Sequence, residues 1–260
     1  MSTYSQDLAL ALQLADAADL ISMSRYQSQD LVVTTKPDNT PVTDADKATE
    51  TAIRQLIAKN HPGDGLIGEE FGEESAGKKR HWIIDPIDGT KNFMRGVPTW
   101  ATLIALVDDG EVVVGVASAP ALTRRWFASK GDGAFVSFNA GAPRKISVSQ
   151  VSNLEDASLM YSDLIGFNER LPAFRSIMDA CWRSRGMGDF WSHMLVAEGA
   201  ADIAIEPSLA LWDMAALDII VREAGGSFTS INGEPGPTHK SGISSNGTLH
   251  QKVIAKLNGN

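Results

Sequence analysis

The chain has few of the residues that mark several common classes of protein. One cysteine, Cys181, stands among 260 residues, so the sequence excludes an internal disulfide framework and any metal site built from several thiolates. Basic residues are also in the minority: 23 Lys and Arg stand against 32 Asp and Glu, for a formal net charge of -9 at pH 7. That balance disfavours a nucleic-acid backbone as the main partner.

Long apolar runs are absent as well. The first residues, Met1 to Asp7, contain no basic segment, and Gln13, Asp16 and Asp19 interrupt the apolar residues that follow. A membrane span needs about 18 consecutive apolar residues, and no stretch of the sequence provides them. We therefore expect a cytoplasmic protein with no signal peptide and no membrane partner. With 43% hydrophobic residues, the chain can still bury a large core.

Hydrophobic periodicity divides the chain into two halves with different patterns. The first half predicts two helices followed by strands, and the second half alternates strands with helices, which is typical of a layered α/β arrangement. The change near residue 145 is a shift of composition without a flexible linker. We therefore expect an α+β half over residues 1–145 and an α/β half over residues 146–260, packed tightly together.

Particular elements follow from the same patterns. Predicted helices cover residues 8–21, 43–59, 168–180, 191–198, 211–223 and 249–257, and predicted strands cover 66–68, 82–84, 102–107, 112–117, 125–129, 134–137, 157–161, 202–206 and 226–230. Residues 31–43 are rich in β-branched residues, Pro, Asp and Asn, which favours a strand or hairpin followed by a turn. Thr43 is a plausible N-cap for the second helix.

The segment 82–90, which reads WIIDPIDGT, is the most informative part of the sequence. An apolar strand ends in two carboxylates, Asp85 and Asp88, and these are followed by Gly89 and Thr90. Two carboxylates at the edge of a core are costly unless a cation compensates them, and oxygen ligands suit Mg²⁺. A helix that opens at the glycine would offer backbone N–H groups to a phosphate. The segment therefore predicts half of a metal-assisted phosphoryl-transfer site.

Two further acidic clusters have a plain and a functional interpretation. Glu69 and Glu70 follow a short apolar strand and could form a solvated loop. Asp213 lies near the start of an apolar helix, where the helix dipole alone favours a carboxylate. Neither cluster decides the function by itself, but each could complete the site that begins at Asp85.

In this order along the chain, the motifs resemble the signatures of the inositol monophosphatase family, whose members are Mg²⁺-dependent, lithium-sensitive phosphomonoesterases. The matching segments are residues 42–46, 68–70, 85–90, 130–135 and 212–226, and the resemblance spans roughly residues 5–257. It implies a metal-dependent phosphatase with a layered α-β-α-β-α sandwich, an α/β (α+β) fold. It also implies a homodimer and two or three Mg²⁺ ions per active site.

The resemblance implies the metal ligands residue by residue. Glu69, Asp85 and the Ile87 carbonyl hold one Mg²⁺ ion. Asp85, Asp88 and Asp213 hold a second, so that Asp85 bridges the pair. Glu69 helps, through waters, to hold a third and weaker ion. The set contains oxygen ligands only, which favours Mg²⁺ over zinc.

The resemblance also implies the catalytic groups and the contacts to phosphate. One ion activates a water as the nucleophile, and Thr90, paired with Asp46, relays its proton, with Glu69 assisting. The backbone N–H groups of Gly89 and Thr90 hold phosphate oxygens. No covalent intermediate on the enzyme is needed.

The pocket for the alcohol part of the substrate is less clearly marked. Glu206 stands where family members place an acidic residue that faces the alcohol. Residues 185–191 resemble the pattern of the histidinol-phosphate phosphatase branch of the family. Within them Asp189 could bind a substrate cation or cap the helix that follows, and Trp191 could face the substrate or the core. We interpret His193 as a packed histidine.

An acidic pocket with aromatic residues suits an amino-alcohol phosphate or an imidazolium better than a neutral polyol. The leading hypothesis is therefore the hydrolysis of L-histidinol phosphate in histidine biosynthesis. Two alternatives stay open: an inositol-1-phosphate phosphatase, and a family member that acts as an RNA-polymerase or ribosomal-RNA accessory factor. The net charge of -9 and the complete set of metal ligands weigh against the accessory factor.

Overall fold

The computed structural model describes residues 3–74 and 77–259, so the outermost residues of both predicted halves lie outside the described residues. The helices in the described chain are α1 (Ser5–Arg25), α2 (Asp44–Asn60), α3 (Thr90–Met94), α4 (Leu171–Ala180), α5 (Asp189–Ala197), α6 (Leu211–Glu223) and α7 (His250–Leu257). Short 3-10 turns are η1 (Pro120–Leu122), η2 (Leu154–Asp156) and η3 (Asn168–Arg170). None of these helices combines the length and the apolar character needed to cross a membrane.

The strands form a hairpin and two sheets. The hairpin pairs β1 (Val33–Thr35) with β2 (Pro41–Thr43). The eight-stranded sheet has the order β10 (Arg144–Ile146), β9 (Gly133–Phe138), β8 (Arg124–Ser129), β7 (Glu111–Ala119), β6 (Ala101–Asp108), β5 (Arg80–Asp88), β3 (Gly65–Gly68), β4 (Gly72–Glu73). The five-stranded sheet has the order β12 (Arg183–Gly186), β11 (Ser158–Tyr161), β13 (Ile203–Glu206), β15 (Gly242–Ser245), β14 (Ser227–Thr229).

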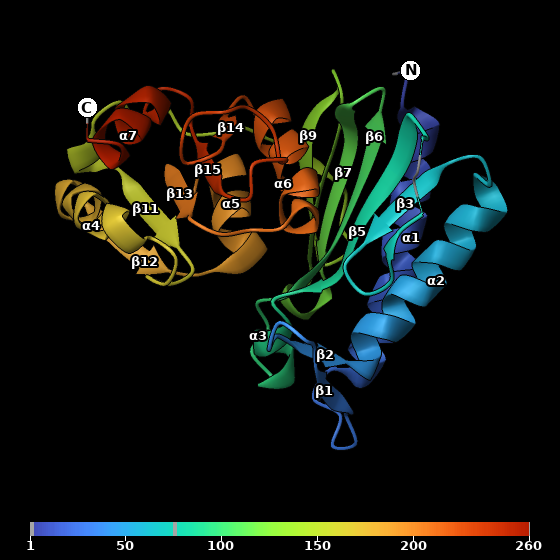
Figure 1. Cartoon of the computed structure of the whole chain (residues 1–260). Coiled ribbons are helices and arrows are strands. Elements are labelled where there is room, and N and C mark those ends of the chain that lie inside the picture. The colour runs from blue at the N-terminus through green and yellow to red at the C-terminus, as the bar shows by residue number, and fades with distance from the viewer. Residues whose placement is uncertain (1–2, 75–76, 260) are drawn as a thin grey trace.

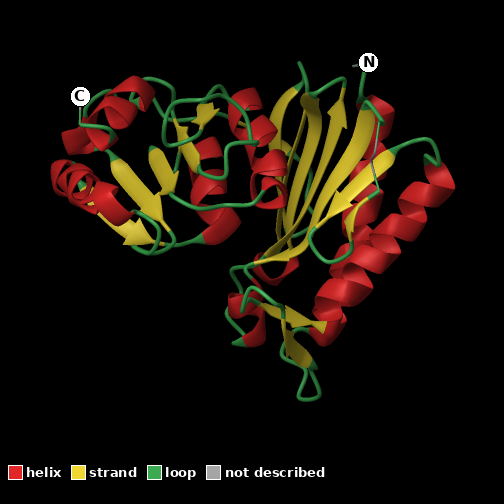
Figure 2. Ribbon diagram, viewed as in Figure 1, coloured by secondary structure: helices red, strands yellow, loops and turns green. Residues whose placement is uncertain are grey.

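Sheets and helices alternate in five layers (Figure 1). Helices α1 and α2 pack on the outer face of the eight-stranded sheet, and α5 and α6 lie between the two sheets. Helices α4 and α7 cover the outer side of the five-stranded sheet (Figure 2). The predicted α-β-α-β-α sandwich is therefore confirmed. The active-site motifs of the sequence come from β5 and from the start of α6, which this layering places side by side.

Close packing of α6 on the eight-stranded sheet depends on a glycine in β7. A Cβ at Gly115 would lie 2.7 Å from the carbonyl oxygen of Ala216 and 2.5 Å from the Ile219 side chain. Only a residue without a side chain lets helix and sheet backbones approach this closely. The contact fixes the position of α6, and therefore of Asp213, relative to the strands.

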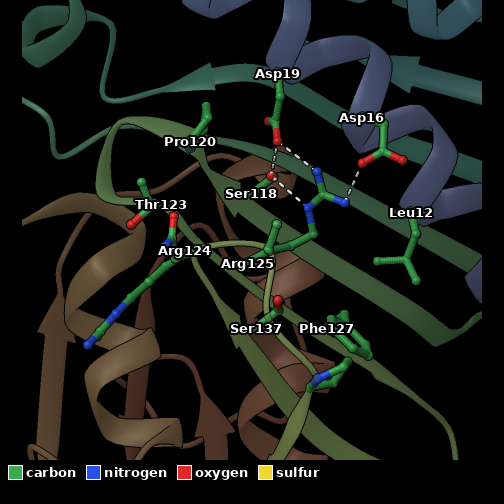
Figure 3. A pocket seen from close by; sticks show the side chains of 13 residues that line it. Leu12, Asp16, Asp19, Ser118, Pro120, Thr123, Arg124, Arg125, Phe127 and Ser137 are labelled. Atoms are coloured by element: carbon green, nitrogen blue, oxygen red, sulfur yellow. Dashed lines mark hydrogen bonds and ion pairs between the residues drawn. The ribbon is translucent and has the colours of Figure 1, made fainter.

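An ion-pair network fastens α1 to the other face of the same sheet (Figure 3). This network borders a cavity of about 530 Å³ beside β8. The Arg125 guanidinium donates to Asp16 at 2.7 Å, to Asp19 at 2.7 Å and to the Ser118 hydroxyl at 2.9 Å. The arginine charge is thus compensated by carboxylates of the chain itself. This arrangement gives the network a structural role in holding the outer helix.

Most predicted elements lie where the sequence places them. Helix α6 spans residues 211–223 as predicted, and the Thr43 hydroxyl accepts hydrogen bonds from the backbone N–H groups of Ala45 and Asp46, which confirms the predicted N-cap of α2. The predicted helix over 168–180 begins instead with the 3-10 turn η3. Four short strands, β4, β10, β12 and β15, were not predicted because their sequences, GE, RKI, RSRG and GISS, lack an apolar run.

Strand β5 is longer than the predicted strand over 82–84. It continues through Asp85 to Asp88, with a shift of its pairing to β6 between these two residues. Pro86 lies in this irregular stretch, where its missing N–H disturbs no ladder hydrogen bond. The two carboxylates therefore belong to the strand itself and do not follow it in a turn.

The two sheets divide near the predicted boundary, but the layers interlock. The last strand of the eight-stranded sheet, β10, ends at Ile146, and the five-stranded sheet begins with β11. Helix α6, from the second half of the sequence, packs against the sheet of the first half. The division into residues 1–145 and 146–260 stays a prediction.

Candidate active site

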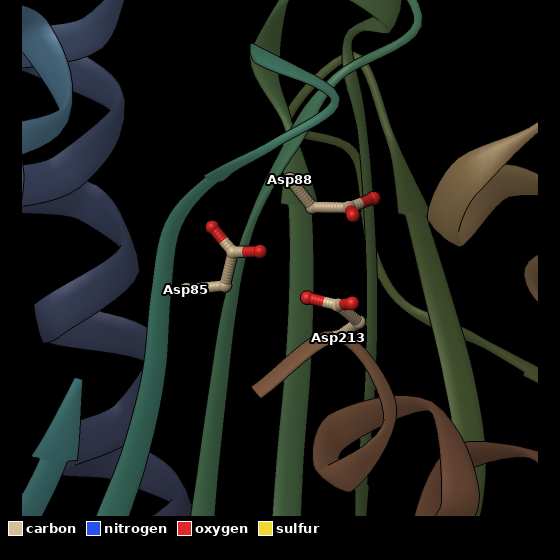
Figure 4. Close-up of side chains that lie close together, drawn as sticks. All are labelled: Asp85, Asp88 and Asp213. Carbon is tan, nitrogen blue, oxygen red and sulfur yellow. The ribbon is translucent and has the colours of Figure 1, made fainter. Parts of the chain in front are cut away.

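Three carboxylates from two distant segments meet between the layers. Asp85 and Asp88 come from β5, and Asp213 comes from the first turn of α6. One oxygen of each lies within 4.8 Å of the others, and the three side chains point toward a common space (Figure 4). Asp85 is only 2% exposed. The structure therefore brings together three of the residues that the sequence singled out as metal ligands.

Backbone groups hold each of these carboxylates in place. The Ile87 N–H donates to Asp85 at 3.0 Å, the Phe190 N–H donates to Asp88 at 2.8 Å, and the Ala210 N–H donates to Asp213 at 2.8 Å. These three donors lie on β5, on α5 and just before α6. The orientation of the carboxylates thus depends on the packing of three separate elements.

The charges of this cluster need compensation. Burial raises the pKa of Asp85 well above its ordinary value, and the nearby carboxylates of Glu69, Asp88 and Asp213 raise it further. Burial likewise raises the pKa of Asp88, and it raises the pKa of Asp213 to about 7. Ionised carboxylates so placed are stable only beside a cation. The donors are all oxygens, and such a set fits Mg²⁺.

Glu69 lies beside this cluster and is paired with a residue that the sequence reasoning missed. The Lys36 ammonium lies 2.7 Å from one oxygen of Glu69 and 2.7 Å from one oxygen of Glu70. Burial tends to lower the pKa of Lys36, but its hydrogen bonds to the two glutamates raise it overall. Lys36 belongs to the turn between β1 and β2, so the predicted hairpin over 31–43 brings a cation to the edge of the site.

Thr90 and Asp46 form the contact that the resemblance implied. The Thr90 hydroxyl lies 3.3 Å from one Asp46 oxygen and 3.1 Å from the Ile87 carbonyl oxygen. The other Asp46 oxygen accepts the Thr43 N–H at 2.7 Å as part of the capping box of α2. Burial raises the pKa of Asp46, and the hydrogen bonds from Thr43 oppose that rise. One carboxylate thus fixes a helix start and contacts the hydroxyl at the site.

Gly89 makes the turn between β5 and α3 possible. Its φ angle is +82°, in the left-handed region, and a Cβ there would lie 3.0 Å from the Thr99 carbonyl oxygen. The chain can therefore pass directly from the carboxylate of Asp88 to the first residue of α3, Thr90. The two backbone N–H groups predicted to hold phosphate lie at this turn.

A second acidic group, formed by Asp163, Asp189 and Glu206, lines the cavity that also contains Asp85, Asp88 and Asp213, and the volume of this cavity is about 400 Å³. Asp189 lies close enough to Asp88 to raise the pKa of that carboxyl. The Ser162 hydroxyl donates to Glu206 at 2.7 Å and accepts the Asp189 N–H at 3.0 Å, so it joins the two acids. Burial raises the pKa of Glu206 to about 8. When ionised, these carboxylates attract a cation.

A comparison with models of protein families identifies the family of this chain. The model of the inositol monophosphatase family matches residues 3–260. The chain belongs to the inositol monophosphatase family. It is thus placed among metal-dependent phosphatases, as the motifs predicted.

Two curated relatives indicate the branch of the family to which the chain is most similar. A histidinol-phosphatase of Mycobacterium tuberculosis is 54% identical over 257 residues, with 97% of this chain and 98% of the relative covered. A histidinol-phosphatase of Streptomyces coelicolor is 52% identical, with 99% of both chains covered. The predicted membership of the histidinol-phosphatase branch is confirmed by these relatives.

Solved structures of the family share the fold over the whole length. The extragenic suppressor protein suhB of Bartonella henselae superposes with a TM-score of 0.88 at 31% identity, covering 97% of this chain and 98% of that one. The Thermotoga maritima IMPase also gives a TM-score of 0.88 at 31% identity, with 98% and 97% covered. The layered sandwich of this chain is therefore the sandwich of the inositol monophosphatase family.

The structure also separates the two interpretations of residues 185–191. Asp189 does not cap α5, because the N-cap position is Gly188, and the Asp189 carboxylate instead accepts the Asn92 amide at 3.0 Å. The capping alternative for Asp189 is therefore wrong. Of this stretch, only Asp189 lines the cavity, while Trp191 packs against the core. His193 is buried, 2.8 Å from the Ser244 hydroxyl, as expected for a packed histidine.

Three cavity residues of one loop were missed from the sequence. Ser162, Asp163 and Ile165 lie in the loop after β11 and line the cavity beside Glu206. Their sequence, a serine, an aspartate and apolar residues at the end of a strand, resembles any exposed loop. The available signal was the position of the loop at the carboxyl end of a parallel strand, where ligands commonly bind in open α/β sheets.

Proposed function

We propose that this protein hydrolyses L-histidinol phosphate to L-histidinol and phosphate, a step of histidine biosynthesis. The observation that carries the proposal is one cavity lined by two groups of acidic residues. Asp85, Asp88 and Asp213 fit a metal ion, and we assign Asp163, Asp189 and Glu206 to the alcohol part of the substrate and call this group the alcohol end of the cavity. Histidinol phosphate carries an ammonium group and an imidazole on its alcohol part, which acidic residues attract. The two relatives named histidinol-phosphatase support the same substrate.

The donor set fits two or three Mg²⁺ ions. Glu69, Asp85 and the Ile87 carbonyl would hold one ion, and Asp85, Asp88 and Asp213 would hold another, with Glu69 contributing to a third through waters. The mutual proximity of Asp85, Asp88 and Asp213 supports the second group. The proposal includes inhibition by Li⁺, which marks the family that the sequence resembles. Excess chelator should remove activity, and full activity in chelator would contradict this part.

Different residues of the chain have different roles in the reaction. When bound, the metal ions supply Lewis-acid activation of a water molecule and stabilisation of the leaving alkoxide. The Thr90 hydroxyl donates to Asp46 and can accept a proton from the attacking water as it passes its own proton on. The raised pKa of Asp46 suits a group that receives this proton. The backbone N–H groups of Gly89 and Thr90 bind the phosphate oxygens.

The alcohol end of the cavity selects the substrate. Glu206 must lose its proton to pair with the ammonium group, and an approaching cation favours that loss. Asp189, held by Asn92, and Glu206, held by Ser162, are fixed before the substrate arrives. Such preorganisation lowers the entropic cost of binding. A neutral polyol would gain hydrogen bonds here but no charge pairing.

The decisive test compares two esters in the same assay. Phosphate release with Mg²⁺ is measured from L-histidinol phosphate and from inositol 1-phosphate. We expect a kcat/KM preference of about 100-fold or more for histidinol phosphate, which corresponds to about 2.7 kcal/mol of transition-state discrimination. Equal rates, or a preference for inositol 1-phosphate, would favour the alternative inositol-1-phosphate phosphatase and contradict the assignment of the cavity.

The alternative of an RNA or transcription accessory factor needs a separate test. Replacing Asp88→Asn should abolish phosphatase activity, whereas the exposed control Asp109→Asn should leave it unchanged. If activity is absent from the wild-type protein while RNA-polymerase or ribosomal-RNA binding survives the Asp88 change, the phosphatase proposal fails.

We also propose a homodimer located in the cytoplasm, and a monomeric mass in light scattering would contradict the dimer.

A further inference from the structure

The proposed metal ligand Glu69 lies on a short turn between two strands. Residues 69–71 join β3, which ends at Gly68, to β4, which begins at Gly72, and these two glycines are paired. A side chain on such a turn is placed only as firmly as the backbone that carries it. The contacts of this backbone therefore decide where Glu69 lies relative to Asp85.

Every backbone N–H group of this turn donates a hydrogen bond. The Glu69 N–H donates to the Ile84 carbonyl oxygen at 3.2 Å. The other two donate to the carboxylate of Glu50, from Glu70 at 2.8 Å and from Phe71 at 3.3 Å. A single side chain of α2 therefore holds the peptide group that follows Glu69 and the next one along the turn.

The carboxylate of Glu50 is itself held by an arginine. Its side chain is 0% exposed, and the Nε atom of Arg54, one turn further along α2, donates to it at 2.8 Å. Arg54 also donates to the Gly72 carbonyl oxygen at 2.6 Å. Charge-assisted hydrogen bonds of this kind are stronger than neutral ones. The Glu50–Arg54 pair thus fastens the turn to α2 from Glu70 to Gly72.

Gly68 gives the Glu50 carboxylate access to the turn. A Cβ at this position would lie 2.0 Å from one Glu50 oxygen and 2.4 Å from the Glu50 Cδ atom. Gly68 does not have a positive φ angle, so the need for glycine here comes from space and not from the backbone conformation. The glycine before Glu69 is therefore explained by the contact between Glu50 and the turn.

Helix α2 also contacts the proposed proton-transfer group. Asp46, which lies 3.3 Å from the Thr90 hydroxyl, precedes Glu50 by four residues, so the two side chains lie on the same face of the helix. Both are buried. The proposed reaction uses Asp46 and gives Glu50 no role. Because one helix contacts both Thr90 and the turn of Glu69, it can fix the distance between them.

We propose that Glu50 is a positioning residue, which raises the affinity of the active site for Mg²⁺ by holding the backbone of Glu69. This inference rests on the proposed function, in which Glu69 and Asp85 hold one metal ion. Glu50 does not line the active-site cavity, so it acts through Glu69. Removing a group that orients a metal ligand typically changes metal affinity by about 10–100-fold.

The first measurement is a calorimetric titration of the full-length protein with Mg²⁺ alone, without substrate. Glu50→Gln should weaken Mg²⁺ binding by about 10-fold or more, because an amide has one acceptor oxygen where the carboxylate uses two. With L-histidinol phosphate as substrate, the Mg²⁺ concentration for half-maximal activity should rise by a similar factor. At saturating Mg²⁺, kcat and the KM for the ester should return to within about threefold of wild type.

Asp218→Asn is the matched control. Asp218 is 2% exposed and, like Glu50, pairs with an arginine four residues later on its helix, at 2.8 Å from Arg222. It does not line the active-site cavity, so this change should lower stability and leave Mg²⁺ affinity unchanged.

A double variant tests whether Glu50 acts through Glu69. Once Glu69→Gln has removed the ligand, adding Glu50→Gln should weaken Mg²⁺ binding by less than about twofold further, since two residues that act through one contact are not additive. Losses that add would show that Glu50 acts on a different ligand and would overturn the proposal.

Two further results would also overturn it: equal Mg²⁺ affinity in wild type and Glu50→Gln, or an equal loss in Asp218→Asn. If Glu50→Gln fails to fold, Gly68→Ala replaces it, because the new Cβ would displace the Glu50 carboxylate. Gly68→Ala should weaken Mg²⁺ binding by about 10-fold, and unchanged affinity would contradict the proposal. A wild-type protein that neither binds Mg²⁺ nor hydrolyses the ester would instead contradict the proposed function, and this inference with it.

Discussion

The two ends of the active-site cavity are built in different ways. At the metal end, Asp85 and Asp88 stand on β5, a strand with partners on both sides in the eight-stranded sheet. At the alcohol end, Asp163 and Ile165 stand on an exposed loop after β11, and Asp189 begins a helix. Two proposed metal ligands are thus held within a sheet, while the residues expected to choose the substrate come from that loop, from the start of α5 and, for Glu206, from the end of β13. Loops can change without disturbing the sheet, which suits a family that varies its alcohols.

The largest effect should come from the metal end. Asp85→Asn should lower kcat for every phosphate ester by about 10³-fold or more, because it removes the ligand shared by both proposed metals. In chelator the same variant should unfold at a higher temperature than wild type, since it removes one buried charge from a crowded acidic cluster.

The measurements are phosphate release on two esters and thermal unfolding followed by circular dichroism. Asp109→Asn, an exposed aspartate in a turn, is the matched control and should change neither quantity. If Asp85→Asn lost activity on one ester only, this residue would affect the choice of substrate. The proposed distinction between a metal end that serves every ester and an alcohol end that selects one would then be wrong.

The next effect concerns the hydroxyl at the boundary of α3. Thr90→Val should lower kcat by about 10²–10⁴-fold, the usual contribution of a proton-transfer group, with a small change of KM. Thr90→Ser keeps the hydroxyl that contacts Asp46 and should retain most of the activity. Equal losses in both variants would indicate that the methyl group, and therefore packing, matters more than the hydroxyl.

A smaller and selective effect is expected at the alcohol end. Glu206→Gln should lower kcat/KM for histidinol phosphate by about 10–100-fold, the range for a lost charge-assisted hydrogen bond. The value for inositol 1-phosphate should change by less than about threefold, because no cation pairs with this carboxylate there. Parallel losses on both esters would show that Glu206 supports the whole site and selects nothing.

The last effect concerns stability and pH in the absence of metal and substrate. Burial raises the pKa of Glu206 from 4.5 in the unfolded chain to about 8 in the folded protein, so the folded state favours its protonated form. Its contribution to stability is complete below pH 4.5 and is lost as the pH rises through about 8. Glutamine does not titrate, so Glu206→Gln should gain stability relative to wild type between pH 5 and pH 9.

Urea unfolding at these two pH values measures that gain, which we expect to be on the order of a few kcal/mol. The comparison uses the difference between the two proteins at each pH, because other groups titrate equally in both. A constant difference across the pH range would mean that Glu206 is ionised in the folded protein throughout.

The sequence predicted the metal end better than the alcohol end, and the reason is physical. Asp85 and Asp88 lie in one segment, at the end of an apolar strand. The local sequence pattern is therefore enough to predict that these carboxylates lie at the edge of the core. Lys36 reaches Glu69 across 33 residues of sequence through a hairpin turn, and no local pattern reports such a contact. The same holds for Ser162, which joins Glu206 and Asp189 only after three elements have packed.

The same distinction explains the errors in the fold. Helix α6, which is buried all round over residues 214–221, was placed at its true bounds because its apolar run is long. The short strands β10, β12 and β15 owe their existence to pairing with neighbours, because their own sequences are polar or small. The interpretation of Asp189 as a cap failed because Gly188 occupies the N-cap position, and the Asp189 carboxylate accepts a hydrogen bond from the Asn92 amide instead.

The position of α6 has a consequence for the synthesis of the chain. Until Glu223 has left the ribosome, the inner face of the eight-stranded sheet, with Leu103, Val107 and Val112, has no helix to cover it. A fragment that ends at residue 145 would expose this apolar surface to water and should aggregate. We therefore expect the nascent chain to bring Asp213 to the candidate site in the same step that covers this apolar face with α6.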